Sequence, residues 1–123
     1  MTTLAALAAA LALAAAPAAP LPPPGLVDGA TAQALVKAGV TVVDVRTPAE
    51  YAGGHIPGAK LVPVDQIEAR AAEVGPKERP VILYCRTGRR TAMARATLVR
   101  LGFTAVYDLQ GLGNWPGPVV SGP

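Results

Sequence analysis

The sequence is poor in the residues that form disulfides, metal sites and aromatic cores. Its 123 residues contain one cysteine, Cys85, which excludes an intramolecular disulfide and a redox cycle with a second cysteine of the same chain. One cysteine and one histidine, His55, leave too few ligands for a structural zinc site, and we expect neither a metal nor a cofactor. With one Trp, three Tyr and one Phe, the core must be built from Val, Leu and Ile.

Charge of either sign is also scarce, which limits the partners that the protein can have. Eleven Lys or Arg face eight Asp or Glu, for a net charge of +3. The basic residues gather around Cys85 and form no long stripe, so we expect no binding to nucleic acid and favour a small anionic ligand. The length suits a single domain.

No charged side chain occurs in residues 1–24. The thirteen Ala and Leu residues at positions 4–16 are too few for a membrane span of about 20 residues but are typical of a secretory signal peptide. No Lys or Arg precedes this run, so a retained apolar anchor and a start codon assigned too far downstream stay open as alternatives. We predict a signal peptide at 1–19, a Pro-rich linker at 20–25 and a domain at 26–123. The mature protein is expected to be periplasmic or secreted, without stable membrane association.

Apolar strands alternate with helix-like segments through the rest of the chain. The expected strands cover residues 26–27, 40–46, 59–62, 81–84 and 105–109. Helices are expected at residues 30–38, from residue 48 to a Gly-Gly break at 53–54, at 65–74, where Asp65 and Glu68 have capping-box spacing, and at 91–101. Because the strands are continuous apolar runs, the pattern predicts a three-layer α/β fold. A mostly parallel sheet of about five strands is covered by helices on both faces.

Cys85 lies where the strand at residues 81–84 ends and the helix at 91–101 is about to begin. Ligand sites of parallel sheets lie beyond the carboxyl ends of the strands, and Arg46 ends another strand at that edge. Gly88 lets the backbone curl so that N–H groups point at the sulfur, and the helix N-terminus and three nearby arginines add positive charge. These features favour a reactive thiolate over the alternative of a small core residue.

Three segments resemble the motifs of one family. Residues 85–90, Cys-Arg-Thr-Gly-Arg-Arg, resemble the C-x-x-G-x-R active-site loop of small, single-domain, rhodanese-type sulfurtransferases. Residues 44–51, Asp-Val-Arg-Thr-Pro-Ala-Glu-Tyr, are similar to that family's D-V-R-x-x-x-E-[YF] segment, and residues 54–59 to its G-H-I-P-G-A segment. The likeness covers about residues 26–115, and the order and spacing of the motifs make it specific.

The resemblance implies that sulfane sulfur moves from thiosulfate to cyanide or a small thiol through a persulfide on Cys85, the catalytic nucleophile. It assigns anion binding to Arg90, and charge extends this role to Arg86 and Arg89. The predicted substrate-binding residues form the loop after the nucleophile: Arg86, Thr87, Gly88, Arg89, Arg90 and Thr91.

Polar residues outside the loop are expected to support the site. Asp44 and Arg46 end a strand and are expected to brace the site as a hydrogen-bonded pair. For His55 the resemblance implies a structural role, since a thiolate formed by backbone N–H groups needs no general base. Glu50 and Tyr51 are expected to pack or to cap a helix.

Two other functions stay open. One is a persulfide carrier with little turnover, and the other is a phosphatase or arsenate reductase of the same superfamily. Those phosphatase-type relatives carry one more residue between the Cys and the Arg of the loop, whereas four residues separate Cys85 from Arg90 here. The sequence also departs from the family where Gln110 replaces a frequent Gly, and where Pro116 and Pro118 cut short the last helix.

Overall fold

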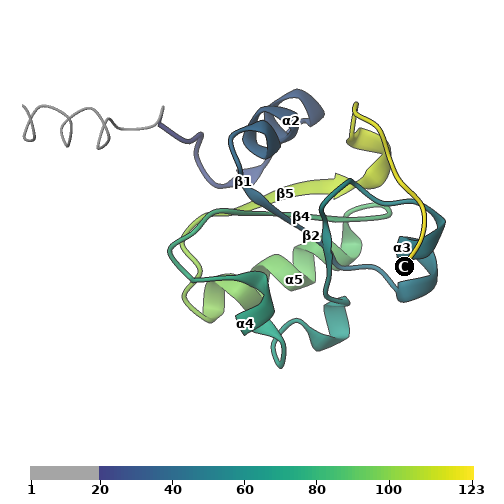
Figure 1. Cartoon of the computed structure of the whole chain (residues 1–123). Coiled ribbons are helices and arrows are strands. Elements are labelled where there is room, and N and C mark those ends of the chain that lie inside the picture. The colour runs from purple at the N-terminus through teal and green to yellow at the C-terminus, as the bar shows by residue number, and fades with distance from the viewer. Residues whose placement is uncertain (1–19) are drawn as a thin grey trace, which may run out of the picture.

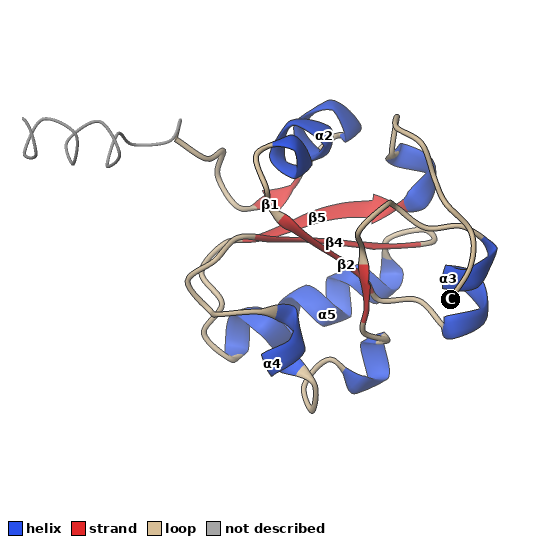
Figure 2. Cartoon of the chain, in the orientation of Figure 1, coloured by secondary structure: helices blue, strands red, loops and turns tan. Residues whose placement is uncertain are grey.

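Five parallel strands form the central sheet of residues 20–123, the part of the chain that this computed structural model describes (Figure 2). The strands, in chain order, are β1 (Gly25–Leu26), β2 (Thr41–Asp44), β3 (Lys60–Leu61), β4 (Val81–Cys85) and β5 (Val106–Gly111). Their order across the sheet is β1-β5-β4-β2-β3, and every adjacent pair is parallel. This confirms the predicted parallel sheet. The predicted signal peptide at residues 1–19 lies outside the described residues.

Helices cover both faces of the sheet, as predicted. The helix α2 (Gly29–Lys37) lies on one side, and α4 (Ala71–Val74) and α5 (Arg89–Arg100) lie on the other (Figure 1). The short helix α3 (Pro48–Gly53) lies near the edge of the sheet where the strands end (Figure 1). Two 3-10 turns, η1 and η2, complete the described elements, at Val64–Gln66 and Leu112–Asn114. The layers therefore follow the three-layer arrangement expected from the sequence.

The central strand β4 contributes to both apolar cores. Its residues point alternately to the two faces, so that Ile82 and Tyr84 join the cluster beneath α2, whereas Leu83 and Cys85 join the cluster that contains α5. All residues of β4 are buried. Burial on both faces explains why this segment is a continuous apolar run in the sequence.

Capping residues set the starts of two helices where the sequence indicates. The Oδ1 of Asp28 accepts a hydrogen bond of 2.8 Å from the N–H of Thr31 in α2. In α3, Thr47 Oγ1 accepts from the N–H of Glu50 at 3.2 Å, and Glu50 Oε1 accepts from the N–H of Thr47 at 3.3 Å, which completes a capping box. This box fixes the carboxylate of Glu50 at the start of α3.

The helix predicted for residues 65–74 is interrupted. Only η1 and the single-turn helix α4 form there, and η1 has no side-chain cap despite the capping-box spacing of Asp65. The backbone at Arg70, with φ −109° and ψ 22°, leaves the helical region just before α4. The resulting turn still buries Ile67 and Val74 in the same core cluster, so tertiary packing overrides the local helical pattern.

A bulge bends β5 where it meets the end of β4. The register shifts by one residue, so that Gln110 pairs with Tyr84 and Gly111 pairs with Cys85. Gln110 has a φ of 70°, the only positive φ outside glycine in residues 20–123, and its N–H donates to Asp108 Oδ1 at 2.8 Å. The bulge thereby brings the end of β5 against the loop that follows Cys85.

The segment after η2, residues 116–123, returns along α3, and we call it the C-terminal strap (Figure 1). Val120 and His55 exchange two backbone hydrogen bonds of 2.8 and 2.9 Å. The N–H of Gly122 donates to the carbonyl of Ala52 at 2.8 Å. These hydrogen bonds therefore fasten the strap to α3 and to the turn that follows it.

The residues before β1 also contact the domain. The hydroxyl of Tyr107 donates to the carbonyl of Pro22 at 2.7 Å, within the segment predicted as a linker, and β1 itself begins at Gly25. Across residues 20–123, none of the helices has the length and apolar character needed to cross a membrane.

Candidate active site

Cys85 ends β4, and its side chain is fully buried, at 0% exposure, where the loop into α5 begins. Its Sγ accepts a hydrogen bond of 3.0 Å from the N–H of Gly88. The thiol lies 3.9 Å from Thr91 Oγ1, and that hydroxyl donates to the Gly88 carbonyl at 2.9 Å. Gly88 has a φ of 107°, a conformation that favours glycine, and it caps α5. The loop thus closes around the sulfur.

This loop lowers the pKa of the Cys85 thiol. Burial alone raises that pKa, but hydrogen bonds from the N–H groups of Thr91, Gly88 and Thr87 outweigh burial. The N-terminus of α5 adds partial positive charge in the same place. Cys85 is therefore poised to form a thiolate at a lower pH than a free thiol.

The bulged end of β5 supports the loop from behind. A Cβ at position 111 would lie 2.4 Å from the carbonyl oxygen of Arg86, so the approach of the loop requires Gly111. A Cβ at Gly88 would meet the Cβ of Gln110 at 3.0 Å. Gln110, the departure from the family pattern noted in the sequence, thus packs its side chain against the turn that holds the sulfur.

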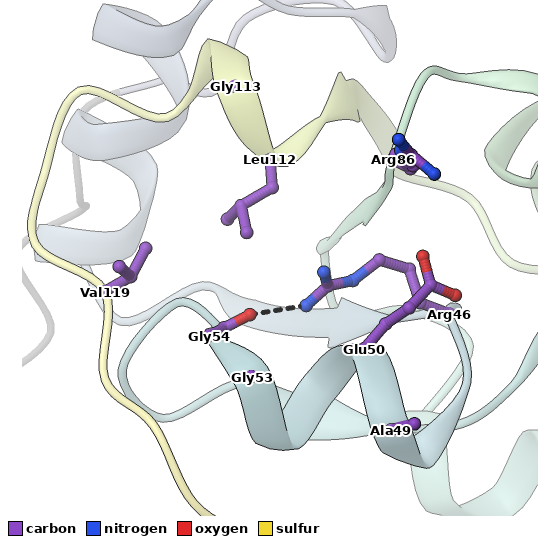
Figure 3. A pocket seen from close by; sticks show the side chains of 9 residues that line it. All are labelled: Arg46, Ala49, Glu50, Gly53, Gly54, Arg86, Leu112, Gly113 and Val119. Atoms are coloured by element: carbon purple, nitrogen blue, oxygen red, sulfur yellow. Dashed lines mark hydrogen bonds between the residues drawn. The ribbon is translucent and has the colours of Figure 1, made fainter.

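Asp44 and Arg46 form a bidentate ion pair at the end of β2. Arg46 Nη2 donates to Asp44 Oδ2 at 2.7 Å and Nε donates to Oδ1 at 3.0 Å, and both residues are buried. Burial lowers the pKa of Arg46, but the hydrogen bonds and charge of Asp44 raise it more strongly. Nη2 also donates to the Gly54 carbonyl at 2.7 Å (Figure 3), and the guanidinium lies 5.4 Å from the centre of the Tyr84 ring. The pair therefore braces the end of β2 against the turn after α3.

Arg90 is already paired in this structure. Its Nη1 and Nη2 donate to Oε1 and Oε2 of Glu50 at 2.6 and 2.9 Å, and each side chain is 29% exposed. Hydrogen bonds from Arg90 lower the pKa of Glu50 to about 2. The hydrogen bonds to Glu50 raise the pKa of Arg90, and the charge of Cys85 adds to that rise. The guanidinium is thus within electrostatic reach of the sulfur but bound to a carboxylate.

His55 is held in place through both its ring and its backbone. Its Nδ1 donates to the carbonyl of Tyr51 at 2.8 Å, which places the proton on that nitrogen. Its ring stacks on Tyr51 with centroids 3.6 Å apart, and its backbone pairs with Val120 of the C-terminal strap. These contacts tie α3 to the strap.

A pocket of about 620 Å³ opens beside the loop, and we call it the carboxyl-end pocket (Figure 3). Its lining residues come from α3, from the ends of β2 and β4, from η2 and from the strap: Arg46, Ala49, Glu50, Gly53, Gly54, Arg86, Leu112, Gly113 and Val119. In Figure 3, Leu112 points toward Arg46 and Gly54 across the pocket, and Arg86 lies at its rim. Arg46 and Glu50 both have partners, whereas Arg86 is exposed and has no ion pair within residues 20–123.

The structure gathers most of the predicted site at one edge of the sheet. Backbone groups of Thr87, Gly88 and Thr91 surround the sulfur, while the Arg86 and Arg89 side chains are exposed. The ion pair of Glu50 with Arg90 was not predicted, because no local pattern links two residues so far apart in the sequence. The pocket walls Leu112 and Val119 were not predicted either, because they lie in segments with no chemical motif of their own. Among the described residues, no cluster of three or more His, Cys, Asp or Glu side chains could hold a metal ion.

Comparison with known proteins gives a family match. The family model described as Rhodanese-like domain matches residues 29–115. A protein of Allochromatium vinosum named Sulfurtransferase is 46% identical over 72 residues, which are 58% of this chain and 66% of that protein, just under two thirds. Thiosulfate sulfurtransferase PspE of Escherichia coli is 35% identical over 81 residues, which are 65% of this chain and 78% of PspE.

A solved structure shows the same fold. The structure described as "rhodanese with anions from E. coli" superposes with a TM-score of 0.64 at 33% sequence identity. The match covers 68% of this chain and 100% of that chain.

Proposed function

Because the chain belongs to the rhodanese-like domain family, we propose that it is a thiosulfate sulfurtransferase that carries sulfur as a persulfide on Cys85. The observation that supports this most directly is the loop at residues 85–91. It directs the N–H of Gly88 at the buried sulfur and lowers the pKa of the thiol. A thiolate stabilised in this way attacks soft electrophiles, and the outer sulfur of thiosulfate is one.

In the first step, the Cys85 thiolate attacks the outer sulfur of thiosulfate. A bond forms between Cys85 Sγ and the outer sulfur of thiosulfate while the S–S bond within thiosulfate breaks. Sulfite leaves with the electron pair of the broken bond. One negative charge stays on the terminal sulfur of the persulfide and two leave with sulfite, so charge is conserved. The exposed guanidinium groups of Arg86 and Arg89 attract the dianion.

In the second step, an acceptor takes the terminal sulfur and the electron pair of the broken S–S bond returns to Sγ. Cyanide yields thiocyanate, and a thiolate yields an organic persulfide. The carboxyl-end pocket, at about 620 Å³, is larger than cyanide requires, and Leu112 and Val119 give it apolar walls. We therefore favour a small organic thiol as the acceptor.

Intact mass spectrometry tests the proposal directly. Thiosulfate is expected to add one sulfur atom to the purified protein, and cyanide or a small thiol is expected to remove it. Cys85→Ser, checked for folding by circular dichroism, is expected to show neither change. Turnover of thiosulfate to thiocyanate by the Ser variant contradicts the mechanism.

The same experiment separates an enzyme from a carrier. An enzyme releases the sulfur rapidly to at least one small acceptor and repeats the cycle. If the wild-type protein takes up one sulfur atom but turns over poorly with every small acceptor, the persulfide-carrier function replaces the enzymatic one.

A further inference from the structure

Glu50 is a charged residue of the carboxyl-end pocket that neither sulfur-transfer step uses. Two elements hold it in place. On its own helix, Oε1 accepts from the N–H of Thr47 at 3.3 Å and from the Thr47 hydroxyl at 3.1 Å. From α5, Arg90 donates to both carboxylate oxygens, at 2.6 and 2.9 Å. The capping box therefore presents a fixed carboxylate to the first turn of the helix that follows the sulfur loop.

The carboxylate of Glu50 affects the balance of charge around the sulfur loop. Arg86 and Arg89 are exposed, and neither forms an ion pair with a described residue. At the end of β2, the buried pair of Asp44 and Arg46 carries no net charge. Glu50 neutralises Arg90 in the same way, so its charge decides whether the loop offers an anion two unpaired guanidinium groups or three.

We propose that Glu50 is a positioning residue that holds Arg90 in an ion pair beside the sulfur loop and limits the positive charge that this loop presents to an anionic substrate. The part that concerns thiosulfate rests on the proposed function. A dianion that enters the pocket must compete with a carboxylate already bound to Arg90 through two hydrogen bonds. The same competition assists release of sulfite, because Arg90 returns to Glu50 when the product leaves.

Glu50→Gln tests the proposal, because it removes the charge while keeping the shape and an oxygen that accepts from the N–H of Thr47. At low salt, the KM for thiosulfate and the inhibition constant for sulfite are both expected to fall by about threefold to tenfold. Both differences are expected to shrink at high salt.

A second readout needs no turnover. The rate of alkylation of Cys85 by iodoacetamide, a neutral reagent, is measured against pH, and its midpoint reports the thiol pKa. With Arg90 no longer neutralised, the midpoint of Glu50→Gln is expected to move to lower pH. Because alkylation does not depend on sulfur transfer, this measurement stands even if thiosulfate proves not to be a substrate.

Three matched variants test whether the effect of Glu50→Gln comes from the ion pair with Arg90, from a loss of stability or from the change in net charge. Thr47→Ala breaks the cap but keeps the carboxylate, and is expected to lower thermal stability without moving the alkylation midpoint. Glu73→Gln removes the same charge from the ion pair of Glu73 with Arg70, at α4, and is expected to leave the KM unchanged. In an Arg90→Ala background, Glu50→Gln is expected to lower neither the KM nor the midpoint.

An unchanged midpoint and KM in Glu50→Gln overturn the proposal. An equal shift in Glu73→Gln overturns it too, because the general loss of negative charge then accounts for the effect. Should Glu50→Gln fail to fold, Glu50→Ala keeps a good helix former at this position and carries the same expectations.

Discussion

The hydroxyl of Tyr84 accepts a hydrogen bond of 3.1 Å from the backbone N–H of Ile56. Tyr84 directly precedes Cys85, and Ile56 lies in the turn that follows α3. Both residues are buried, so the bond joins the strand that carries the nucleophile to the turn that Arg46 also contacts. Burial raises the pKa of Tyr84 well above its usual range, which keeps the phenol protonated.

Tyr84→Phe is therefore expected to leave the N–H of Ile56 buried without a partner. The expected loss is about 1–3 kcal/mol in the free energy of unfolding, measured by urea denaturation. Tyr107→Phe is the control, because the Pro22 carbonyl that it releases is only half-buried and can bind water. Equal stability of Tyr84→Phe and the wild type contradicts the prediction.

The depressed pKa of Glu50 predicts a specific acid sensitivity. Its pKa is about 2 in the folded protein and 4.5 as the ordinary value, so ionised Glu50 favours the folded state. This stabilisation is fully present above pH 4.5 and is lost as the pH falls toward 2. Urea midpoints of wild type and Glu50→Gln are expected to differ most at pH 6 and to converge as the pH approaches about 2. A gap that stays constant with pH contradicts the assignment.

Local patterns in the sequence predict the frame of the site but not its cross-links. The apolar run into Cys85, the glycine after it and the capping residues of α2 and α3 each act within a few residues. The ion pair of Glu50 and Arg90 joins positions 40 residues apart, and no local pattern around either residue indicates that the two are partners. The φ of 70° at Gln110 could not be predicted from the sequence either. The bulge of β5 imposes this backbone conformation, and propensity scales assign it to glycine and not to glutamine.

The prediction of a helix at residues 65–74 is wrong for a related reason. Its apolar residues do have helical spacing, and Ile67 and Val74 do enter the core. The chain buries them with a turn instead of a continuous helix, because the neighbouring strand and α5 fix where each side chain must go. The local pattern therefore predicted a continuous helix where tertiary packing forms a turn.

The exposed arginines near the loop are expected to act through charge. Arg86→Ala and Arg89→Ala are each expected to raise the KM for thiosulfate by about twofold to fivefold at low salt and to flatten its dependence on salt. Arg100→Ala, at the other end of α5, removes the same charge and is expected to change neither quantity. If the Arg86 and Arg89 variants match the Arg100 variant, both residues are solvated surface residues only.

Loop length is expected to decide between sulfur and phosphate chemistry. Four residues separate Cys85 from Arg90, and the N–H of Gly88 lies only 3.0 Å from Sγ, so a phosphoryl group in line with the sulfur has little room. Thiosulfate is expected to react, and aryl phosphates and arsenate are not. One glycine inserted after Gly88 is expected to abolish sulfur transfer. Phosphatase activity of the unmodified protein that disappears in Cys85→Ser identifies a phosphatase instead.

Export is expected to remove the apolar N-terminal segment. The mature protein is predicted to begin between residues 17 and 21. These positions precede both Pro22, which contacts Tyr107, and β1 in the sequence, so cleavage leaves the sheet intact. N-terminal sequencing of the protein from a periplasmic fraction is expected to find one of these positions. Met1 or Thr2 at the start of soluble protein from the cytoplasm contradicts the prediction.

The order of the strands also sets when the domain can close during its synthesis. Among the strands of residues 20–123, β1 has only β5 as a neighbour, although β1 leaves the ribosome first and β5 last. The edge of the sheet therefore stays open until nearly the whole domain has been translated. A nascent chain with this strand order cannot complete its sheet until β5 emerges.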